Sequence, residues 1–237
     1  MIKPDKSKLD SKKIQVKDMF NDISSRYDKI NKMMTLNMDK NWRKVVYNLS
    51  MQDNPNKIID IATGTGDIAL CFANDDVEVI GVDNASMMLD IANKKITKTS
   101  NIKFQLEDAE NMSFEDNTFD AATVGFGVRN FENLSQGLDE IKRVLKPGKK
   151  IIILETAVPS FFIFRFGYFL YTKLIVPVLG RMIAKNQQAY QYLSTSAEHF
   201  PHGKEFQLIL ENAGFENINI KVLSLGIVNI YTASKPR

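Results

Sequence analysis

The stretch IDIATGTGDIAL, residues 59–70, decides the fold. Its apolar beginning contains Asp60 and predicts a strand, and a turn with Gly64 and Gly66 then leads into a helical pattern that starts at Asp67. Glycine lets a backbone turn tightly and bring bare N–H groups close to a ligand. The beginning of a helix carries partial positive charge, which attracts carboxylates and phosphates. The stretch therefore predicts a strand, a turn and a helix that together hold a ligand.

Apolar strands alternate with helices along the rest of the chain. Strands are predicted at 57–62, 77–83, 102–108, 119–126 and 149–155, and helices at 14–50, 67–73, 86–97 and 134–145. A helix at 204–212 precedes two strands at 217–223 and 227–234, which a short turn joins and which are therefore antiparallel. The alternation predicts an α/β protein with a mostly parallel sheet, covered by helices on both faces. Ligands of such sheets bind beyond the carboxyl ends of the strands.

The bulk composition argues against several classes of protein. A net charge of +3 does not demand a nucleic-acid partner. The single cysteine, Cys71, cannot form an intramolecular disulfide, which suits a reducing cytosol. The most apolar segment, 161–180, contains Arg165 and Lys173, so we do not expect it to span a membrane. No metal site is predicted.

Acidic residues stand at three successive strand ends. Asp83 ends the second predicted strand and can accept both hydroxyls of a ribose. Asp108 ends the third and can accept from an adenine amino group, and Asp60 in the first could help to hold an ammonium group. This series favours S-adenosylmethionine, which carries such an ammonium group.

Two other interpretations of the glycine turn stay open. Residues 64–69 also fit the G-x-G-x-x-A form of a dinucleotide fingerprint, which would indicate an NAD-dependent oxidoreductase. In a doubly wound domain without a ligand, the glycines would serve only to tighten the turn.

Several longer stretches carry a resemblance to a known family. They are MFNDISSRYDKINKMMTLNMDKNWRK at 19–44, DIATGTGD at 60–67, FEDNTFDAATVGFGVRNFEN at 114–133, RVLKPGKKIIILE at 143–155, YQYLSTSAEHFP at 190–201 and ENAGF at 211–215. The sequence resembles the UbiE/MenG family, the C-methyltransferases of ubiquinone and menaquinone biosynthesis. The resemblance implies a class I, Rossmann-like methyltransferase fold that uses S-adenosylmethionine, with a seven-stranded, mostly parallel sheet whose last strand is antiparallel.

The same resemblance shapes the expected organisation. We expect one domain over 1–237, with an N-terminal arm and helical cap at 1–50 and a cofactor-binding core at 56–156. A helical lid insert would follow at 157–200, and a C-terminal helix with a strand pair at 201–237.

The expected cofactor contacts combine the family positions with the residues singled out above. They are Tyr27, Asp60, Gly64, Thr65, Gly66, Asp83, Asn84, Asp108, Ala109 and Gly125. Tyr27 and its neighbour Asp28 are expected to close over the cofactor. The chain departs from the usual family pattern at Asp108, where Asn is common, and at Gly125, where Ser is frequent.

The implied reaction needs a reduced quinol, because an oxidised quinone carbon is too electron-poor to attack a methyl group. Arg129 and Asn130 are expected to stabilise the developing phenolate. The sequence does not identify the general base: Tyr190 is our choice of catalytic residue, and the alternatives are Tyr192, Asp39, His199 and His202.

The segment from Thr156 to Ala197 contains no Asp or Glu and many aromatic residues. Its aromatics either pack on the core or form a lid that grips a prenyl tail and rests on an anionic membrane surface. We favour the lid, and hence a cytoplasmic protein that associates peripherally with the inner face of the membrane. A homodimer is left open, and no nucleic-acid partner is expected.

The expected function is methylation of demethylmenaquinol to menaquinol. The alternatives are the same chemistry on 2-polyprenyl-6-methoxy-1,4-benzoquinol, or on both substrates, and, from other classes, the nicotinamide oxidoreductase and a non-catalytic lipid-binding protein.

Overall fold

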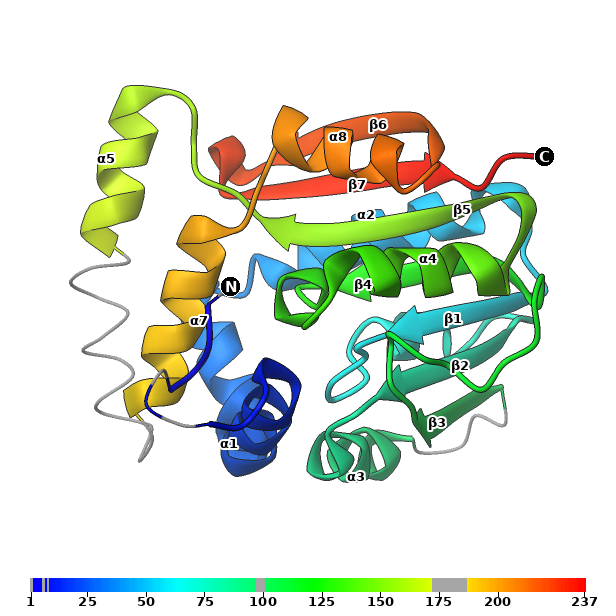
Figure 1. The fold of residues 1–237 in the computed structure, drawn as a ribbon, viewed down its shortest axis with the longest axis horizontal. Helices are drawn as coiled ribbons and strands as arrows, with labels where there is room; N and C mark the ends of the chain where they lie inside the picture. Colours follow the sequence, from blue (N-terminus) through cyan, green and yellow to red (C-terminus); the bar gives the residue numbers. More distant parts are fainter. Residues whose placement is uncertain (1, 6, 8, 97–100, 172–186) are drawn as a thin grey trace.

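A single seven-stranded sheet organises the protein (Figure 1). The computed structural model describes residues 2–5, 7, 9–96, 101–171 and 187–237, without the side chains of residues 187 and 190. The strand order is β3-β2-β1-β4-β5-β7-β6. The strands are β1 (Lys57–Ile61), β2 (Glu78–Asp83), β3 (Ile102–Leu106), β4 (Phe119–Gly125), β5 (Leu145–Thr156), β6 (Glu216–Leu223) and β7 (Val228–Ser234).

The strand directions confirm the predicted fold class. Strands β1 to β5 pair in parallel, whereas β7 is antiparallel to both of its neighbours, β5 and β6. Strand β1 is buried at every residue after Lys57, as expected for a strand covered on both faces. The switch in strand order beside β1 places a crevice at the carboxyl ends of β1 and β4.

Helices cover both faces of the sheet. The helices are α1 (Lys12–Met34), α2 (Asp39–Ser50), α3 (Ser86–Lys95), α4 (Leu134–Val144), α5 (Phe162–Leu170), α7 (Gln187–His199) and α8 (Lys204–Asn212). Leu138 of α4 and Phe206 of α8 are buried in the cluster on one face, and Trp42 and Val46 of α2 in the cluster on the other. Helices α1, α3 and α7 share a third apolar cluster.

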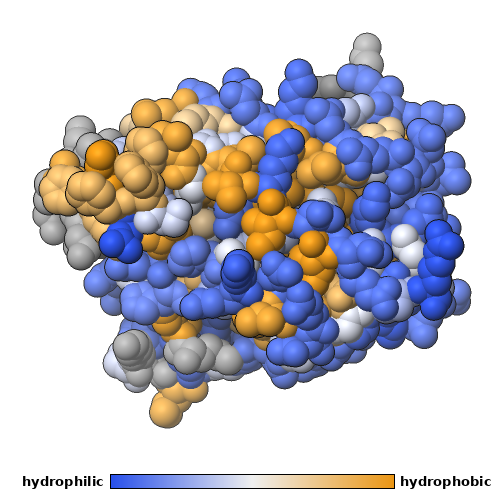
Figure 2. Space-filling model, turned by 90° about the horizontal axis from the view of Figure 1, so that it is seen from above, coloured by the Kyte–Doolittle hydropathy of each residue, from blue (hydrophilic) through white to orange (hydrophobic). Residues whose placement is uncertain are grey.

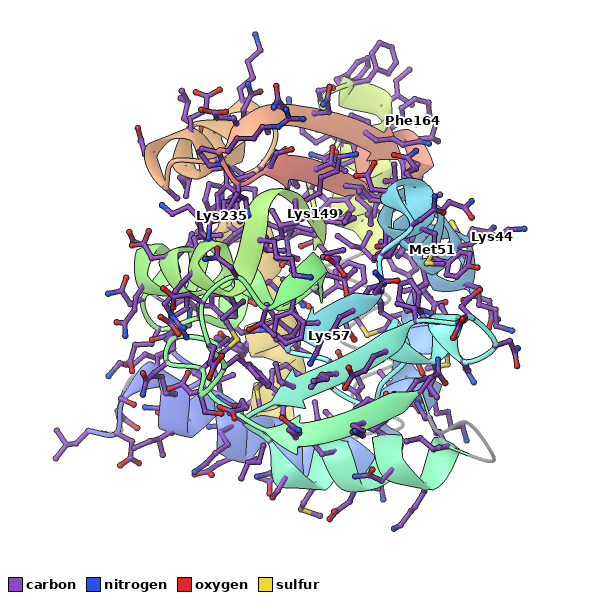
Figure 3. The ribbon with its side chains drawn as sticks, turned by 90° about the vertical axis from the view of Figure 1, so that its right-hand side faces the viewer. Lys44, Met51, Lys57, Lys149, Phe164 and Lys235 are labelled. Carbon is purple, nitrogen blue, oxygen red and sulfur yellow. The ribbon has the colours of Figure 1, made fainter. Side chains whose placement is uncertain are left out.

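The third cluster lies beyond the carboxyl ends of the strands. In Figure 1, α1 and α7 stand on the side to which the arrowheads of β1 and β5 point. Figure 3 looks onto the opposite end of the sheet, where Lys57 begins β1 and Lys149 lies in β5. The N-terminal helix therefore returns to cover the strand ends where a ligand is expected.

The N-terminal helical segment is interrupted. Helix α1 ends where Leu36 and Asn37 take positive φ angles of 51° and 61°. The Thr35 hydroxyl donates to the Asn31 carbonyl at 2.8 Å and to the Asp39 carboxylate at 2.9 Å, which joins the end of α1 to the beginning of α2.

The predicted helix at 67–73 was wrong. The structure has only a short 3-10 turn, η2 (Ala69–Phe72), between β1 and β2. The Asn101 side-chain amide donates to the carbonyls of Phe72, Asp75 and Val77 at 2.9, 3.3 and 3.1 Å, and these bonds turn the chain directly into β2. A single short turn aligns few peptide dipoles, so its electrostatic attraction for a ligand is weak. Individual backbone N–H groups and carboxylates must therefore provide most of the ligand binding at the end of β1.

The predicted lid is described in two parts. Helix α5 spans residues 162–170 and helix α7 spans residues 187–199. Residues 172–186 of the predicted lid insert lie outside the described residues. Within the part of the chain that the structure describes, no helix combines the length and apolar character needed to cross a membrane.

Candidate active site

A cleft opens at the carboxyl ends of β1, β2 and β4. Of the residues predicted for the site, those that line it are Tyr27, Gly64, Asp83, Asn84, Asp108, Ala109, Gly125 and Asn130. Lining residues that were not predicted include Lys13, Val16 and Phe20 of α1, and Phe126 after β4. The cleft thus joins the strand ends to the inner side of the N-terminal helix.

The turn after β1 is tied to the end of β2 by one carboxylate. Gly64 has a φ of +56°, and its N–H donates to Asp83 Oδ2 at 2.8 Å. Asp83 Oδ1 accepts from the Ala85 N–H at 2.9 Å. Burial raises the pKa of Asp83, although the backbone N–H groups around it act in the opposite direction. Each carboxylate oxygen has a further lone pair, so Asp83 can still accept from two ligand hydroxyls.

Two other predicted cofactor residues, Asp60 and Thr65, bond to side chains around the turn. Asp60 is 1% exposed and accepts from the hydroxyls of Thr63 and Thr123 at 2.5 and 2.6 Å. The Thr65 hydroxyl donates to Asp28 of α1 at 2.6 Å. These bonds fix the turn to the sheet and to α1, and direct contact with a ligand remains a prediction for both residues.

Gly66 is required for packing. It has a φ of +81°, and a Cβ atom there would lie 2.6 Å from the ring of Phe104 in β3. Any larger residue at this position would therefore push the turn away from the sheet.

Asp108 lines the cleft, and its carboxylate is paired with a lysine of α1. Lys13 Nζ lies 2.7 Å from Asp108 Oδ2 and 3.2 Å from Glu110 Oε2. Burial opposes the charge, yet hydrogen bonds to Asp108 and Glu110 raise the pKa of Lys13. The first turn of α1 is therefore attached to the segment after β3 that was predicted to bind adenine.

The neighbouring Lys12 attaches α1 to the segment after β4. Its ammonium group donates to the carbonyls of Arg129 and Phe131 at 2.9 and 2.6 Å. Burial lowers the pKa of Lys12 to about 8. Lys12 therefore bridges two carbonyls of this loop.

The segment after β4 forms the far wall of the cleft. Phe126 has a φ of +55°, rare for a residue with a side chain. A Cβ atom on Gly125 would lie 2.4 Å from Ile68 Cδ1, which explains why this chain has no side chain there. Asn130 donates to the Phe126 carbonyl at 3.2 Å and accepts from the Tyr192 hydroxyl at 3.2 Å.

Among the described base candidates, Tyr192 is the one that contacts a residue of the cleft. Burial raises its pKa to about 12, so it is a neutral hydrogen-bond donor near pH 7. His199 is exposed and bonded to the Thr195 carbonyl, and Asp39 pairs with Arg43 at 2.6 Å.

The remaining base candidates lie elsewhere. His202 has its ring nitrogen 3.4 Å from the Phe200 carbonyl. The side chain of Tyr190 lies outside the described residues, so its catalytic role stays a prediction.

Arg129 does not line the cleft. Its side chain is 8% exposed and its Nη1 lies 2.5 Å from Oε1 of Glu155, which is 1% exposed. Glu155 was missed by sequence reasoning. It stands near the end of β5, as Asp60 and Asp83 do in their strands, so the rule that acids at strand ends mark a site could have found it.

Comparison with known proteins decides the family. Residues 6–235 match the sequence pattern of the ubiE/COQ5 methyltransferase family. The chain belongs to this family. A demethylmenaquinone methyltransferase of Bacteroides fragilis is 38% identical over 93% of this chain and 92% of the relative. A ubiquinone/menaquinone biosynthesis C-methyltransferase of Geotalea daltonii is 36% identical over 96% of this chain and 99% of the relative.

Solved structures agree on the fold of this ubiE/COQ5 family member. A methyltransferase from Thermotoga maritima matches with a TM-score of 0.68 at 17% identity, over 92% of this chain and 99% of the other. A phosphoethanolamine N-methyltransferase from Haemonchus contortus, solved with S-adenosyl-L-methionine, matches with a TM-score of 0.61 at 16% identity, over 83% and 53%. The protein is a methyltransferase, and its cofactor is S-adenosylmethionine.

The cleft fits that cofactor. Asp83 offers two carboxylate oxygens for ribose hydroxyls, and Gly64 and Gly125 leave the backbone bare beside it. Asp108 keeps Oδ1 beside the Glu110 N–H, and displacement of Lys13 from Oδ2 would free an acceptor for an adenine amino group. When bound, the cofactor supplies a methyl group on a positively charged sulfur.

We expect Asp83→Ala to raise the Kd for S-adenosylmethionine roughly 5- to 150-fold, about 1–3 kcal/mol, because two ribose hydroxyls and the Gly64 N–H lose their acceptor. Isothermal titration calorimetry measures the effect. Asp90→Ala, an exposed carboxylate on the adjoining helix α3, is the control and should bind like wild type. Equal Kd values for both variants would contradict a ribose contact.

The buried Asp60 should make stability depend on pH. Burial raises its pKa from 3.8 to about 6, so the folded protein holds this proton more tightly than the unfolded chain. Its contribution to the free energy of unfolding is present in full below pH 3.8 and is lost as the pH rises through 6. The wild-type value minus that of Asp60→Asn should therefore fall by up to about 3 kcal/mol between pH 4 and 7. Urea titrations at several pH values measure it, and a pH-independent difference would refute the assignment.

Proposed function

We propose that this protein transfers a methyl group from S-adenosylmethionine to a ring carbon of demethylmenaquinol, giving menaquinol. The observation that carries the proposal is family membership over nearly the whole chain, together with relatives named demethylmenaquinone methyltransferase at 35–38% identity. The cleft at the strand ends supplies a carboxylate for the cofactor, Asp83, and on the opposite wall the amide of Asn130, which accepts a hydrogen bond from the Tyr192 hydroxyl.

The chain's own residues support this chemistry in two ways. Helix α1 places the apolar side chains of Val16 and Phe20 in the cleft, which keeps water away from the sulfonium and favours the dispersal of its charge. The Tyr192 hydroxyl fixes the Asn130 amide, and the guanidinium of Arg129 lies beside the same segment. These groups hold a quinol ring and stabilise negative charge on its oxygen.

A ubiquinone precursor, 2-polyprenyl-6-methoxy-1,4-benzoquinol, is the second candidate substrate. One observation favours it: the Geotalea daltonii relative carries a name that joins both pathways. The family assignment disfavours the nicotinamide oxidoreductase, because a methyltransferase pattern covers residues 6–235.

We expect chemically reduced demethylmenaquinone to gain one methyl group on its ring when it is incubated with the enzyme and S-adenosylmethionine. Mass spectrometry of the extracted quinone measures the gain. The oxidised quinone should not react, because its ring carbon cannot donate electrons, and the benzoquinol should react more slowly. Cofactor binding without turnover on either quinol would indicate a lipid-binding protein and refute the proposal.

We further propose that α5 rests on an anionic membrane surface and delivers the prenylated substrate. Most of its large apolar side chains are exposed: Phe162, Ile163, Phe164, Phe166 and Leu170. Figure 2 shows hydrophobic side chains gathered at the left-hand end of the molecule, where α5 lies in Figure 1. Such an exposed apolar helix that carries Arg165, in a segment without acidic residues, is typical of an interfacial contact.

We expect Phe162→Ser/Phe166→Ser to weaken binding to phosphatidylglycerol vesicles by about tenfold or more, because two exposed rings no longer enter the membrane interface. Co-sedimentation at low salt measures the bound fraction. The control is Leu208→Ser, since Leu208 is 57% exposed on α8 and should not contribute. Pelleting of the double variant to the same extent as wild type would refute the membrane contact by α5.

A further inference from the structure

The ion pair between Arg129 and Glu155 is buried but incompletely bonded. Glu155 Oε1 accepts from Arg129 Nη1 at 2.5 Å, and from the N–H and hydroxyl of Thr156 at 2.8 and 3.1 Å. The other oxygen, Oε2, and Arg129 Nε are both buried without a hydrogen-bond partner among the described residues. Arginine and carboxylate groups commonly form two parallel bonds, and buried polar atoms are nearly always paired. Within the described part of the chain, this pair therefore has one donor, Arg129 Nε–H, and one acceptor, Glu155 Oε2, that form no hydrogen bond.

The pair lies one side chain away from the cleft. The guanidinium carbon of Arg129 is 5.7 Å from the centre of the Phe126 ring, and Phe126 lines the cleft. Asn130, the residue after Arg129, also lines the cleft and accepts from Tyr192. The unpaired Nε–H is thus next to the wall that we assign to the quinol.

The backbone and the side chain of Arg129 are fixed by different groups. Lys12 of α1 holds its carbonyl at 2.9 Å. Glu155 is the one hydrogen-bond partner of its guanidinium in the described part of the chain. The direction in which the guanidinium points is therefore set by Glu155.

We propose that Glu155 is a positioning residue for methyl transfer: it holds the Arg129 guanidinium behind Phe126, at the wall of the cleft assigned to the quinol, where its positive charge stabilises the negative charge that develops on the quinol oxygen. The inference rests on the proposed function. In the step, the phenolic O–H bond breaks and the proton goes to water. The electron pair on oxygen moves onto the ring, the ring carbon forms a bond to the methyl group, and the pair of the broken carbon–sulfur bond stays on sulfur. Loss of the ring proton to water then restores the aromatic ring, and the oxygen takes a proton back from water to give menaquinol.

Among the other ionisable groups around Arg129, three phenols stay uncharged near neutral pH, whereas one lysine loses its charge near pH 8 in wild type and variants alike. Tyr27 of α1, Tyr168 of α5 and Tyr192 of α7 lie close enough to interact with its charge, and burial raises the pKa of all three phenols. Lys12 also faces it, with a pKa lowered to about 8 by burial. Glu155 is the acidic group bonded to it, so a change at Glu155 is the direct way to alter this environment.

The experiment compares Glu155→Gln with Asp120→Asn. Asp120 is also buried, 7% exposed, and pairs with Lys146 at 2.8 Å, but it bonds the N–H of Lys57 at the opposite end of the sheet, the end that Figure 3 faces. Rates of methylation of reduced demethylmenaquinone are measured between pH 6 and 10, with the Kd for S-adenosylmethionine by calorimetry and thermal unfolding by circular dichroism.

We expect Glu155→Gln to lower kcat about 100-fold, with the Kd for S-adenosylmethionine within about threefold of wild type. Its kcat should rise about tenfold per pH unit up to alkaline pH, because the quinol must then ionise without a directed guanidinium. Asp120→Asn should lower the unfolding temperature and keep the wild-type kcat and pH profile. Glu155→Asp keeps the charge but shortens the side chain, and should lower kcat at least about tenfold if the glutamine variant does not fold.

A wild-type kcat and pH profile in Glu155→Gln, or in Glu155→Asp where the glutamine variant is unfolded, would overturn the inference and leave the proposed function intact. An inactive wild-type enzyme on every quinol would overturn the proposed function and the inference with it.

Discussion

The hydrogen bond from the Gly64 N–H to the Asp83 carboxylate is the constraint on which the cofactor half of the site depends. It joins the turn after β1 to the end of β2, and it needs the left-handed φ of +56° at Gly64. Since η2 is too short to act as a strong dipole, the charge at this edge comes from side chains and single N–H groups. Parallel strands bring those groups together without any further structure, because their carboxyl ends meet at one edge.

The carboxyl ends of the strands form the floor of the cleft, and helix α1 covers it as a roof. Lys12 reaches the segment after β4 and Lys13 reaches the segment after β3, while Asp28 bonds both Thr65 and Lys95. Each contact is polar, and burial of the Lys12 ammonium lowers its pKa to about 8, so the roof is held by bonds that are individually weak or costly. Apolar residues of α1 also pack in a buried cluster with α3 and α7, so the helix is held by apolar contacts as well as by these polar bonds.

The sequence predicted the sheet well because buried parallel strands are mostly apolar along their length, as in β1 and β4. The ligand-facing places of Gly64 and Asp83 followed from the rule for strand ends. The helix at 67–73 could not be excluded, because the bonds that end it come from Asn101, which is distant in the chain. The pairing of Arg129 with Glu155 likewise depends on two neighbouring strands, and no local pattern reveals it.

Acidic residues at or just after the ends of neighbouring strands illustrate how one residue type takes different roles. Asp60 accepts from two threonine hydroxyls and supports the turn, whereas Asp83 accepts from backbone N–H groups and faces the cleft. Asp108 is paired with a lysine of the roof, and Glu155 with a buried arginine. The carboxylate is the same in each case, so its partner decides whether it supports the turn, faces the cleft, binds the N-terminal helix or pairs with a buried arginine. An assignment of function to such residues must therefore start from what each oxygen bonds, since position along the strand alone does not distinguish them.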